Sequence, residues 1–107
     1  MKIYLAGKVS GTDIAATTIK FGQMQHDIEQ MGVEAINPLE VVNDWKSTWN
    51  AAMRKCIIAM MTADIVLLLP DWKESDGARI EKILAEDLGI PVYDNIKAVK
   101  YVIEETL

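Results

Sequence analysis

The sequence of 107 residues has a single cysteine, Cys56, and a single histidine, His26. One cysteine excludes an internal disulfide and any zinc site built from several cysteines. One histidine excludes the usual sites in which paired histidines hold a metal. Metal binding would depend on carboxylates alone, and we expect no metal site.

Basic residues are also few, with 11 Lys and Arg against 16 Asp and Glu and a net charge of -5. Binding to polymeric nucleic acid requires clustered cations that displace counterions, so this balance argues against such a partner. A small anionic ligand in a local pocket is still compatible with it.

Long apolar segments are absent, because runs such as 65–69 are far too short to cross a bilayer. Met1 leads directly into a strand-like segment without a signal-peptide pattern. We therefore expect no membrane association and a cytoplasmic location. A content of 50% hydrophobic and 25% charged residues is typical of a globular protein, and we expect one domain over residues 1–107.

Short aliphatic segments alternate with segments of helical periodicity. Strands are predicted at 2–6, 33–37, 64–69 and 90–93, the last at a sheet edge because of Pro91. Helices are predicted at 13–31, from an N-cap at Ser47 to about residue 60, at 78–88 and at 96–107, with an irregular or one-turn segment at 39–45. This order predicts a three-layer, doubly wound α/β fold of the flavodoxin or Rossmann type, with a short, mainly parallel sheet of four to five strands. Such sheets bind ligands beyond the carboxyl ends of their strands.

The loop after the first strand combines two glycines with polar side chains: Gly7, Lys8, Ser10 and Gly11. Backbone N–H groups at the start of a helix favour an anionic group. The spacing matches neither a Walker loop nor the three-glycine dinucleotide pattern. A turn that needs glycine only for its backbone conformation explains the loop about equally well.

Glu81 lies on the third long helix, in a column with Gly77 one turn before it and Ala85 one turn after it. Small neighbours leave its carboxylate approachable. The larger apolar residues of the helix form an adjacent stripe that we expect to face the core: Ile80, Leu84 and Leu88. Glu81 is therefore either a functional group or a structural one paired with Arg54, Arg79 or a backbone donor.

Tyr4 and Trp72 are predicted near the same sheet edge and could stack on a planar base, although packing is the commoner role. Cys56 lies within an apolar stripe and is interpreted as a small core residue. Trp45, Trp49 and the methionine-rich helix after them could instead form an oligomer interface.

Several motifs together resemble the nucleoside 2-deoxyribosyltransferase superfamily, which includes the 2'-deoxynucleoside 5'-phosphate N-hydrolases. They are Tyr4-Leu5-Ala6-Gly7 with Ser10-Gly11, Ala63-Asp64, and Ser75-x-Gly77-x-x-x-Glu81. Within it, Asn37-Pro38-Leu39 and Leu69-Pro70-Asp71-Trp72 look most like a branch of short bacterial and phage proteins.

The resemblance implies that Glu81 attacks C1' of a deoxyribose, with Tyr4 beside it, and that water or another base then takes the sugar. It places the first loop and Ser75 around the 5' end of the sugar, where a serine tolerates a phosphate that a carboxylate would repel. Gly77, Asp71 and Trp72 complete the candidate substrate-binding residues. The implied ligand is a nucleoside or, preferably, a nucleoside 5'-monophosphate, without cofactor, bound by a homo-oligomer.

One departure concerns a second catalytic aspartate of that superfamily, which falls here on Cys56. A buried thiol cannot replace a carboxylate that handles a proton. Either another acid, such as Asp71 or Asp76, has taken over, or the domain binds nucleotides without cleaving them. The sequence thus supports two hypotheses, an N-glycosidase or deoxyribosyltransferase-like enzyme and an inactive nucleotide-binding module.

Overall fold

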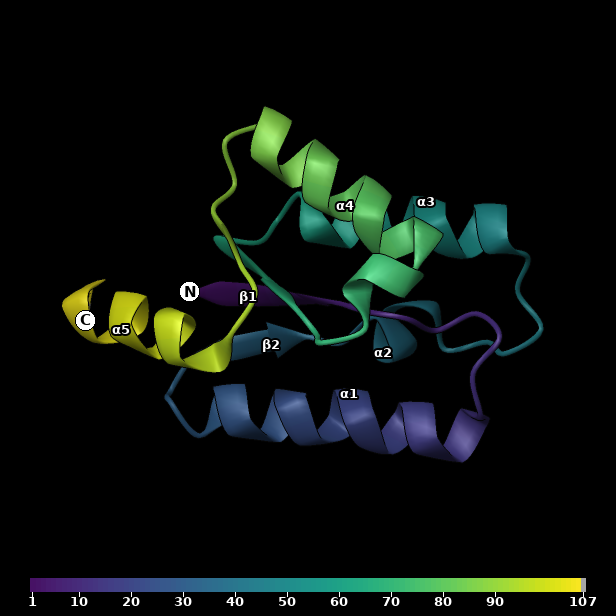
Figure 1. Cartoon of the computed structure of the whole chain (residues 1–107), viewed down its shortest axis with the longest axis horizontal. Helices are drawn as coiled ribbons and strands as arrows, with labels where there is room; N and C mark the ends of the chain where they lie inside the picture. The colour runs from purple at the N-terminus through teal and green to yellow at the C-terminus, as the bar shows by residue number, and fades with distance from the viewer. Residues whose placement is uncertain (107) are drawn as a thin grey trace.

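Strands and helices alternate along the chain as the residue pattern predicts (Figure 1). A computed structural model describes residues 1–106. The elements in chain order are β1 (Lys2–Ala6), α1 (Ile14–Glu29), β2 (Glu34–Ile36), α2 (Pro38–Val42), α3 (Trp49–Met60), β3 (Ile65–Leu68), a 3₁₀ turn η1 (Trp72–Glu74), α4 (Asp76–Asp87), β4 (Val92–Tyr93) and α5 (Ile96–Thr106).

The four strands form one parallel sheet in the order β2-β1-β3-β4. The chain moves outward from β1 to β2, then returns to add β3 on the other side of β1. The ends of β1 and β3 therefore flank the point at which the connections diverge, where sheets of this kind hold their ligands. The predicted three-layer, flavodoxin-like α/β fold is confirmed, and β4 is an edge strand as Pro91 indicated.

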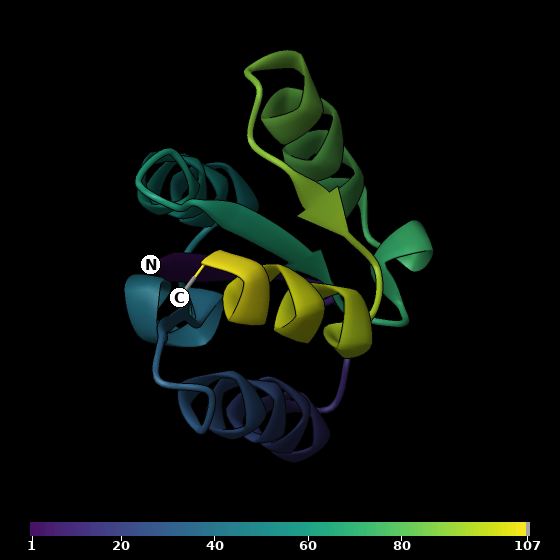
Figure 2. The same ribbon diagram turned by 90° about the vertical axis from the view of Figure 1, so that its left-hand side faces the viewer.

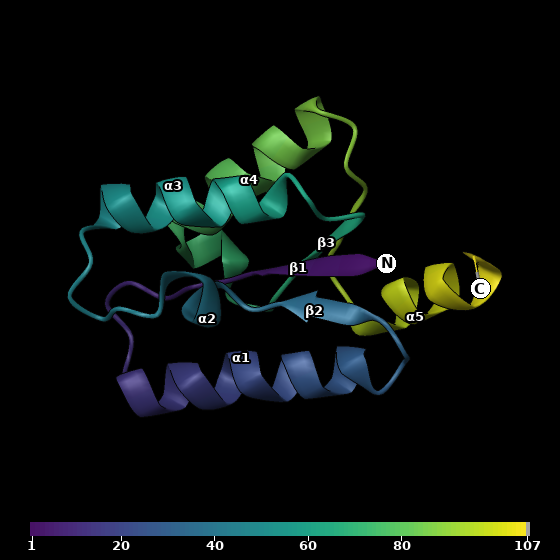
Figure 3. The ribbon, with the colours of Figure 1, turned by 180° about the vertical axis from the view of Figure 1, so that it is seen from behind.

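Each central strand is buried on both faces, because alternate side chains enter two separate cores. Ile3 and Leu5 point to the side covered by α1 and α5, whereas Tyr4 and Ala6 point to the side covered by α3 and α4. Figure 2 shows these two helical layers with the sheet between them. Figure 3 shows α2 beside the carboxyl ends of β1 and β2.

Two helix starts differ from their predicted positions. The N-cap of α3 is Thr48 and not Ser47, because the Thr48 hydroxyl accepts the Ala51 N–H at 3.2 Å. Helix α4 begins at Asp76 and not at Ala78, because Ser75 is its N-cap and accepts the Ala78 N–H at 3.1 Å. Ser75 is thereby fixed at the carboxyl edge of the sheet.

The face of α4 that packs on the sheet also differs from the prediction. Ile80 and Leu88 are exposed and Leu84 is only partly buried, whereas the small column with Glu81 is buried: Gly77, Ala78, Glu81 and Ala85. Small side chains let α4 approach the sheet and α3 closely. At Gly77, an added Cβ would lie 2.8 Å from the Met53 sulfur. This close approach carries Glu81 inward.

None of the helices within residues 1–106 has both the length and the apolar character needed to span a membrane.

Candidate functional site

A cavity of about 680 Å³ opens at the carboxyl edge of the sheet. This volume suits a small organic ligand of nucleotide size. Its walls come from the first loop, from the segment around α2 and the following turn, and from the inner faces of α3 and α4. Among the residues that line it are Tyr4, Gly7, Ser10, Gly11, Trp45, Trp49, Cys56, Ser75, Gly77 and Glu81.

Glu81 and Tyr4 form the polar centre of the cavity wall. The Tyr4 hydroxyl donates a hydrogen bond to Glu81 Oε2, across 77 residues of sequence. Glu81 is only 5% exposed, and Tyr4 is completely buried. Neither Arg54 nor Arg79 pairs with Glu81 among the described residues, and Arg79 is bonded to Asp76 instead. The carboxylate thus has a single hydroxyl partner and faces a cavity.

Burial raises the pKa of Glu81 from its ordinary 4.5 to about 7, because a charged carboxylate loses hydration there. The Tyr4 hydrogen bond offsets part of this rise. Burial likewise raises the pKa of Tyr4 well above 10, and the neighbouring Glu81 charge raises it further. Tyr4 is therefore a neutral donor, and Glu81 changes protonation near neutral pH.

Cys56 also lines the cavity, from the inner face of α3. Burial raises the pKa of its thiol, and the Glu81 charge adds to that effect. The thiol is therefore neutral beside Tyr4, and it supplies neither a thiolate nucleophile nor a second negative charge.

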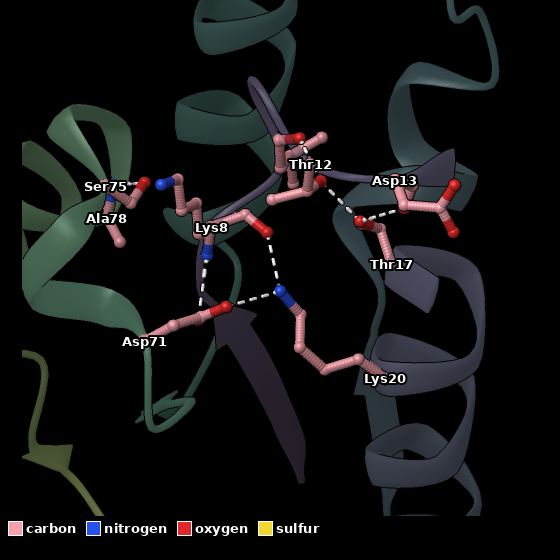
Figure 4. A network of polar contacts seen from close by, with 9 residues as sticks. Lys8, Thr12, Asp13, Thr17, Lys20, Asp71, Ser75 and Ala78 are labelled. Carbon is pink, nitrogen blue, oxygen red and sulfur yellow. Dashed lines mark hydrogen bonds and ion pairs between the residues drawn. The ribbon is translucent and has the colours of Figure 1, made fainter. Parts of the chain in front are cut away.

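The first loop is held by contacts on both sides of the Lys8 peptide (Figure 4). The Lys8 N–H donates to Asp71 Oδ1 at 3.0 Å, and the Lys8 carbonyl accepts from Lys20 Nζ at 2.7 Å. Lys20 Nζ and Asp71 Oδ2 lie 2.6 Å apart and close the network. Gly7 is required here, since an added Cβ would lie 2.9 Å from Leu69 Cβ and 3.1 Å from Asp71 Oδ1. The network fixes the backbone that borders the cavity.

A second, smaller cavity of about 310 Å³ adjoins the main one. It shares Ser10, Trp49, Ser75 and Gly77 with the main cavity and adds the Lys8 side chain. Figure 4 shows that side chain pointing toward Ser75 at the start of α4. A cation and a helix N-terminus thus lie at the same edge.

The structure brings most of the predicted site residues to these two cavities. The exceptions are Asp71, which is bonded to Lys20 and the Lys8 N–H, and Trp72, whose ring lies 5.8 Å and 5.5 Å from the ammonium groups of Lys73 and Lys82. Neither residue is among those that line either cavity. Asp76 borders only the smaller one.

Residues 43–47 and Trp49 line the main cavity, although the sequence had not placed them there. Trp45 and Trp49 are about half exposed and offer aromatic surface, and Asp44 is the second carboxylate of the wall. The apolar stripe of Trp49, Met53, Cys56 and Met60 predicts a core position for Trp49, which is wrong because Trp49, in the first turn of α3, is 45% exposed. The sequence left open an oligomer interface formed by Trp45, Trp49 and the methionine-rich helix. In the structure both tryptophans line the cavity. Met53 and Met60 of α3 point toward the interior of the protein.

Within residues 1–106, no three His, Cys, Asp or Glu side chains gather in an arrangement that could hold a metal ion.

Comparison with protein families gives a match over residues 1–94 to a family described as a domain of unknown function, DUF4406. Comparisons with curated proteins and with solved structures give no significant match.

Proposed function

The chain belongs to the DUF4406 family, whose description assigns no activity, and we propose from the site that it cleaves the N-glycosidic bond of a 2'-deoxynucleoside, preferably a 5'-monophosphate. Glu81 is the nucleophile of this proposal. The product is a free base together with a deoxyribosyl group that is passed to water or to another base.

The observation that carries the proposal is a buried carboxylate with one hydroxyl partner at the wall of a nucleotide-sized cavity. In the first step, a Glu81 oxygen bonds to C1' as the bond from C1' to the base nitrogen breaks, and the leaving base accepts a proton. In the second step, water bonds to C1', loses a proton and releases Glu81. Each step inverts the configuration at C1', so the two steps together retain the original anomeric configuration.

The ionisation of Glu81 suits this chemistry. With a pKa of about 7, the carboxylate is close to half ionised at neutral pH and becomes nucleophilic as the pH rises. The Tyr4 hydroxyl favours the ionised form and fixes the direction of the carboxylate. Asp44, the other carboxylate that lines the main cavity, is the candidate for handling the proton of the leaving base.

The other residues around the two cavities favour a bound monophosphate whose phosphate lies at the start of α4 and whose base lies at the tryptophans. Lys8, Ser10 and Ser75 at the start of α4 favour the 5'-phosphate. Trp45 and Trp49 offer aromatic surface on which a base can stack. We expect such a reaction to be cytoplasmic and to involve no polymeric nucleic acid.

Cys56 favours a second candidate function. Its neutral thiol takes the place of the second acid that the resembling enzymes carry beside their nucleophile. On that basis the domain would bind a deoxynucleotide in the same cavity without cleaving it.

The decisive experiment incubates the protein with the four common deoxynucleoside monophosphates and measures free base by chromatography. We expect base release that falls at least about a thousandfold in Glu81→Ala. Glu86→Ala is the matched control, because Glu86 is an exposed carboxylate of the same helix whose ion pair with Lys82 lies away from the cavity.

Calorimetry with the same nucleotides separates the two candidates. Equal background release from wild type and Glu81→Ala, together with measurable binding, would establish the binding module. Absence of both release and binding would reject the cavity as a nucleotide site.

A further inference from the structure

The outward-facing surface of α3 and α4 is apolar, although helix surfaces that face solvent are normally polar. Ile58 is 70% exposed, and Ile83 and Leu88 are each 59% exposed. Met61 and Ile80 are also exposed. We call these five residues the α3–α4 outer face. Ile83 and Ile58 lie on the sides of their helices opposite the buried residues, whereas Leu88 is the C-cap of α4 and lies two turns after the buried Glu81 on the same side. None of the five lines either cavity.

These side chains come from two neighbouring helices of the same layer. Both helices run antiparallel to the strands of the sheet, and Figures 1 and 3 show α4 inclined to α3, so that the two helices separate toward their C-terminal ends. The two helices approach closely at Gly77 of α4, where an added Cβ would lie 2.8 Å from the Met53 sulfur. Ile58 and Met61 lie one turn apart on α3, as Ile80 and Ile83 do on α4. A single exposed apolar residue is ordinary, but several on two neighbouring helices indicate an interaction surface.

The charges along the outer side of α4 identify the partner. Its first half carries two cations, Arg79 and Lys82, and its last turn carries two anions, Glu86 and Asp87. Within the chain, Arg79 is bonded to Asp76, and Lys82 Nζ lies 2.7 Å from Glu86 Oε1. Asp87 makes no ion pair with any residue of 1–106. An identical helix laid antiparallel across this surface brings opposite charges together, whereas a parallel one brings like charges together.

We propose that the α3–α4 outer face binds the same face of a second copy of the chain, with the two α4 helices antiparallel across a two-fold axis near Ile83. Ile83 then packs against its counterpart, and Arg79 of each copy lies opposite Asp87 of the other. Such an interface is self-complementary, as closed dimers require. This proposal gives a location to the homo-oligomer expected from the sequence and does not depend on the proposed reaction.

The dimer is tested by sedimentation velocity over a range of protein concentrations. Wild type is expected to sediment as a dimer at micromolar concentration. Ile83→Lys is expected to weaken dimerisation more than a hundredfold, since the substitution buries two lysines at the axis. Ile19→Lys is the matched control, because Ile19 is 70% exposed on α1, on the opposite helical layer, and its replacement leaves the dimer intact. The proposal is overturned if wild type is still a monomer at a concentration 100-fold above micromolar. It is also overturned if Ile83→Lys and Ile19→Lys weaken the dimer equally.

Charge reversal tests the antiparallel arrangement separately. Arg79→Glu and Asp87→Lys each place like charges together and are expected to raise the dimer dissociation constant about fivefold, whereas the double variant restores it. Each reversal is compatible with folding, because an anion near the start of a helix and a cation near its end are favourable. Circular dichroism confirms the fold of each variant. Failure of the double variant to restore dimerisation rejects the antiparallel pairing.

Discussion

Two carboxylates, those of Asp71 and Glu81, lie on either side of the start of α4, and they differ in how many hydrogen-bond donors surround them. Asp71 holds the first loop, with Lys20 Nζ at 2.6 Å and the Lys8 N–H at 3.0 Å. Glu81 lies five residues after the start of the helix, and its one hydrogen-bond partner among residues 1–106 is the Tyr4 hydroxyl.

The two pKa values show the consequence of this difference. Burial by itself would raise the pKa of Asp71, but the bonds from Lys20 and the Lys8 N–H outweigh it and lower the pKa. At Glu81 burial outweighs the single Tyr4 bond, and the pKa rises to about 7. A carboxylate surrounded by donors is a structural tether, whereas one that the fold leaves undersupplied at a cavity is available for chemistry.

Replacing Glu81 is expected to produce the largest effect, because the native state keeps a proton that the unfolded chain loses. A raised native pKa means that stability falls as the pH rises from about 4.5 to about 7 and is constant above that range. Glu81→Gln removes this titration. Relative to wild type, its free energy of unfolding should therefore increase by about 3 kcal/mol between pH 4.5 and pH 8.

Urea denaturation at several pH values measures this change, and Glu86→Gln serves as the exposed control. A difference between Glu81→Gln and wild type that is the same at pH 5 and pH 8 would contradict the buried, protonated carboxyl.

Removing the hydroxyl of Tyr4 is expected to produce the next largest effect. Because that hydroxyl lowers the pKa of Glu81, Tyr4→Phe should raise it further above 7. The lost bond should cost about 2 kcal/mol of stability at pH 8, where Glu81 is charged, and less at pH 5.

Carbon-13 NMR of the Glu81 carboxyl group follows the titration directly, without reference to any activity. Tyr93→Phe is the control, because Tyr93 packs on the other face of the sheet. A titration midpoint that stays unchanged or moves downward in Tyr4→Phe would show that the hydroxyl does not act on this carboxyl.

Residue patterns were sufficient for the fold because strand and helix signals are local. The continuous aliphatic run at 65–69 identified the buried strand, and Gly89 with Pro91 bounded the last one. The predicted buried face of α4 was wrong because the prediction assigned the large apolar side chains to the core and not the small ones. The close approach of α3, seen at Met53 and Gly77, decides that face, and it is a tertiary contact.

The candidate site was predictable to the extent that its residues follow strand ends. Tyr4, Gly7, Ser75 and Glu81 belong to β1, α4 and the turns next to them, and all four line the cavity. The role of Asp71 was not predictable, since its partner Lys20 lies 51 residues away and no periodic pattern links them. Residues 43–47 and Trp49 reach the cavity through the turn after α2, whose path depends on packing.

Disrupting the tether at Asp71 is expected to produce the smallest effect, and one of opposite sign. A lowered native pKa gives stability that is present above pH 4 and is lost as the pH falls through the native pKa. Asp71→Asn should therefore cost about 1 kcal/mol at pH 7 and progressively less toward pH 3. Lys20→Met should cost a similar amount in wild type and nothing more in Asp71→Asn, because both changes remove the same ion pair. Urea denaturation of the two single variants and the double variant measures the coupling. A cost of Asp71→Asn that does not depend on pH, or that is fully additive with the cost of Lys20→Met, would show that the ion pair does not hold the loop. Asp71 and Glu81 would then differ only in how deeply each carboxylate is buried.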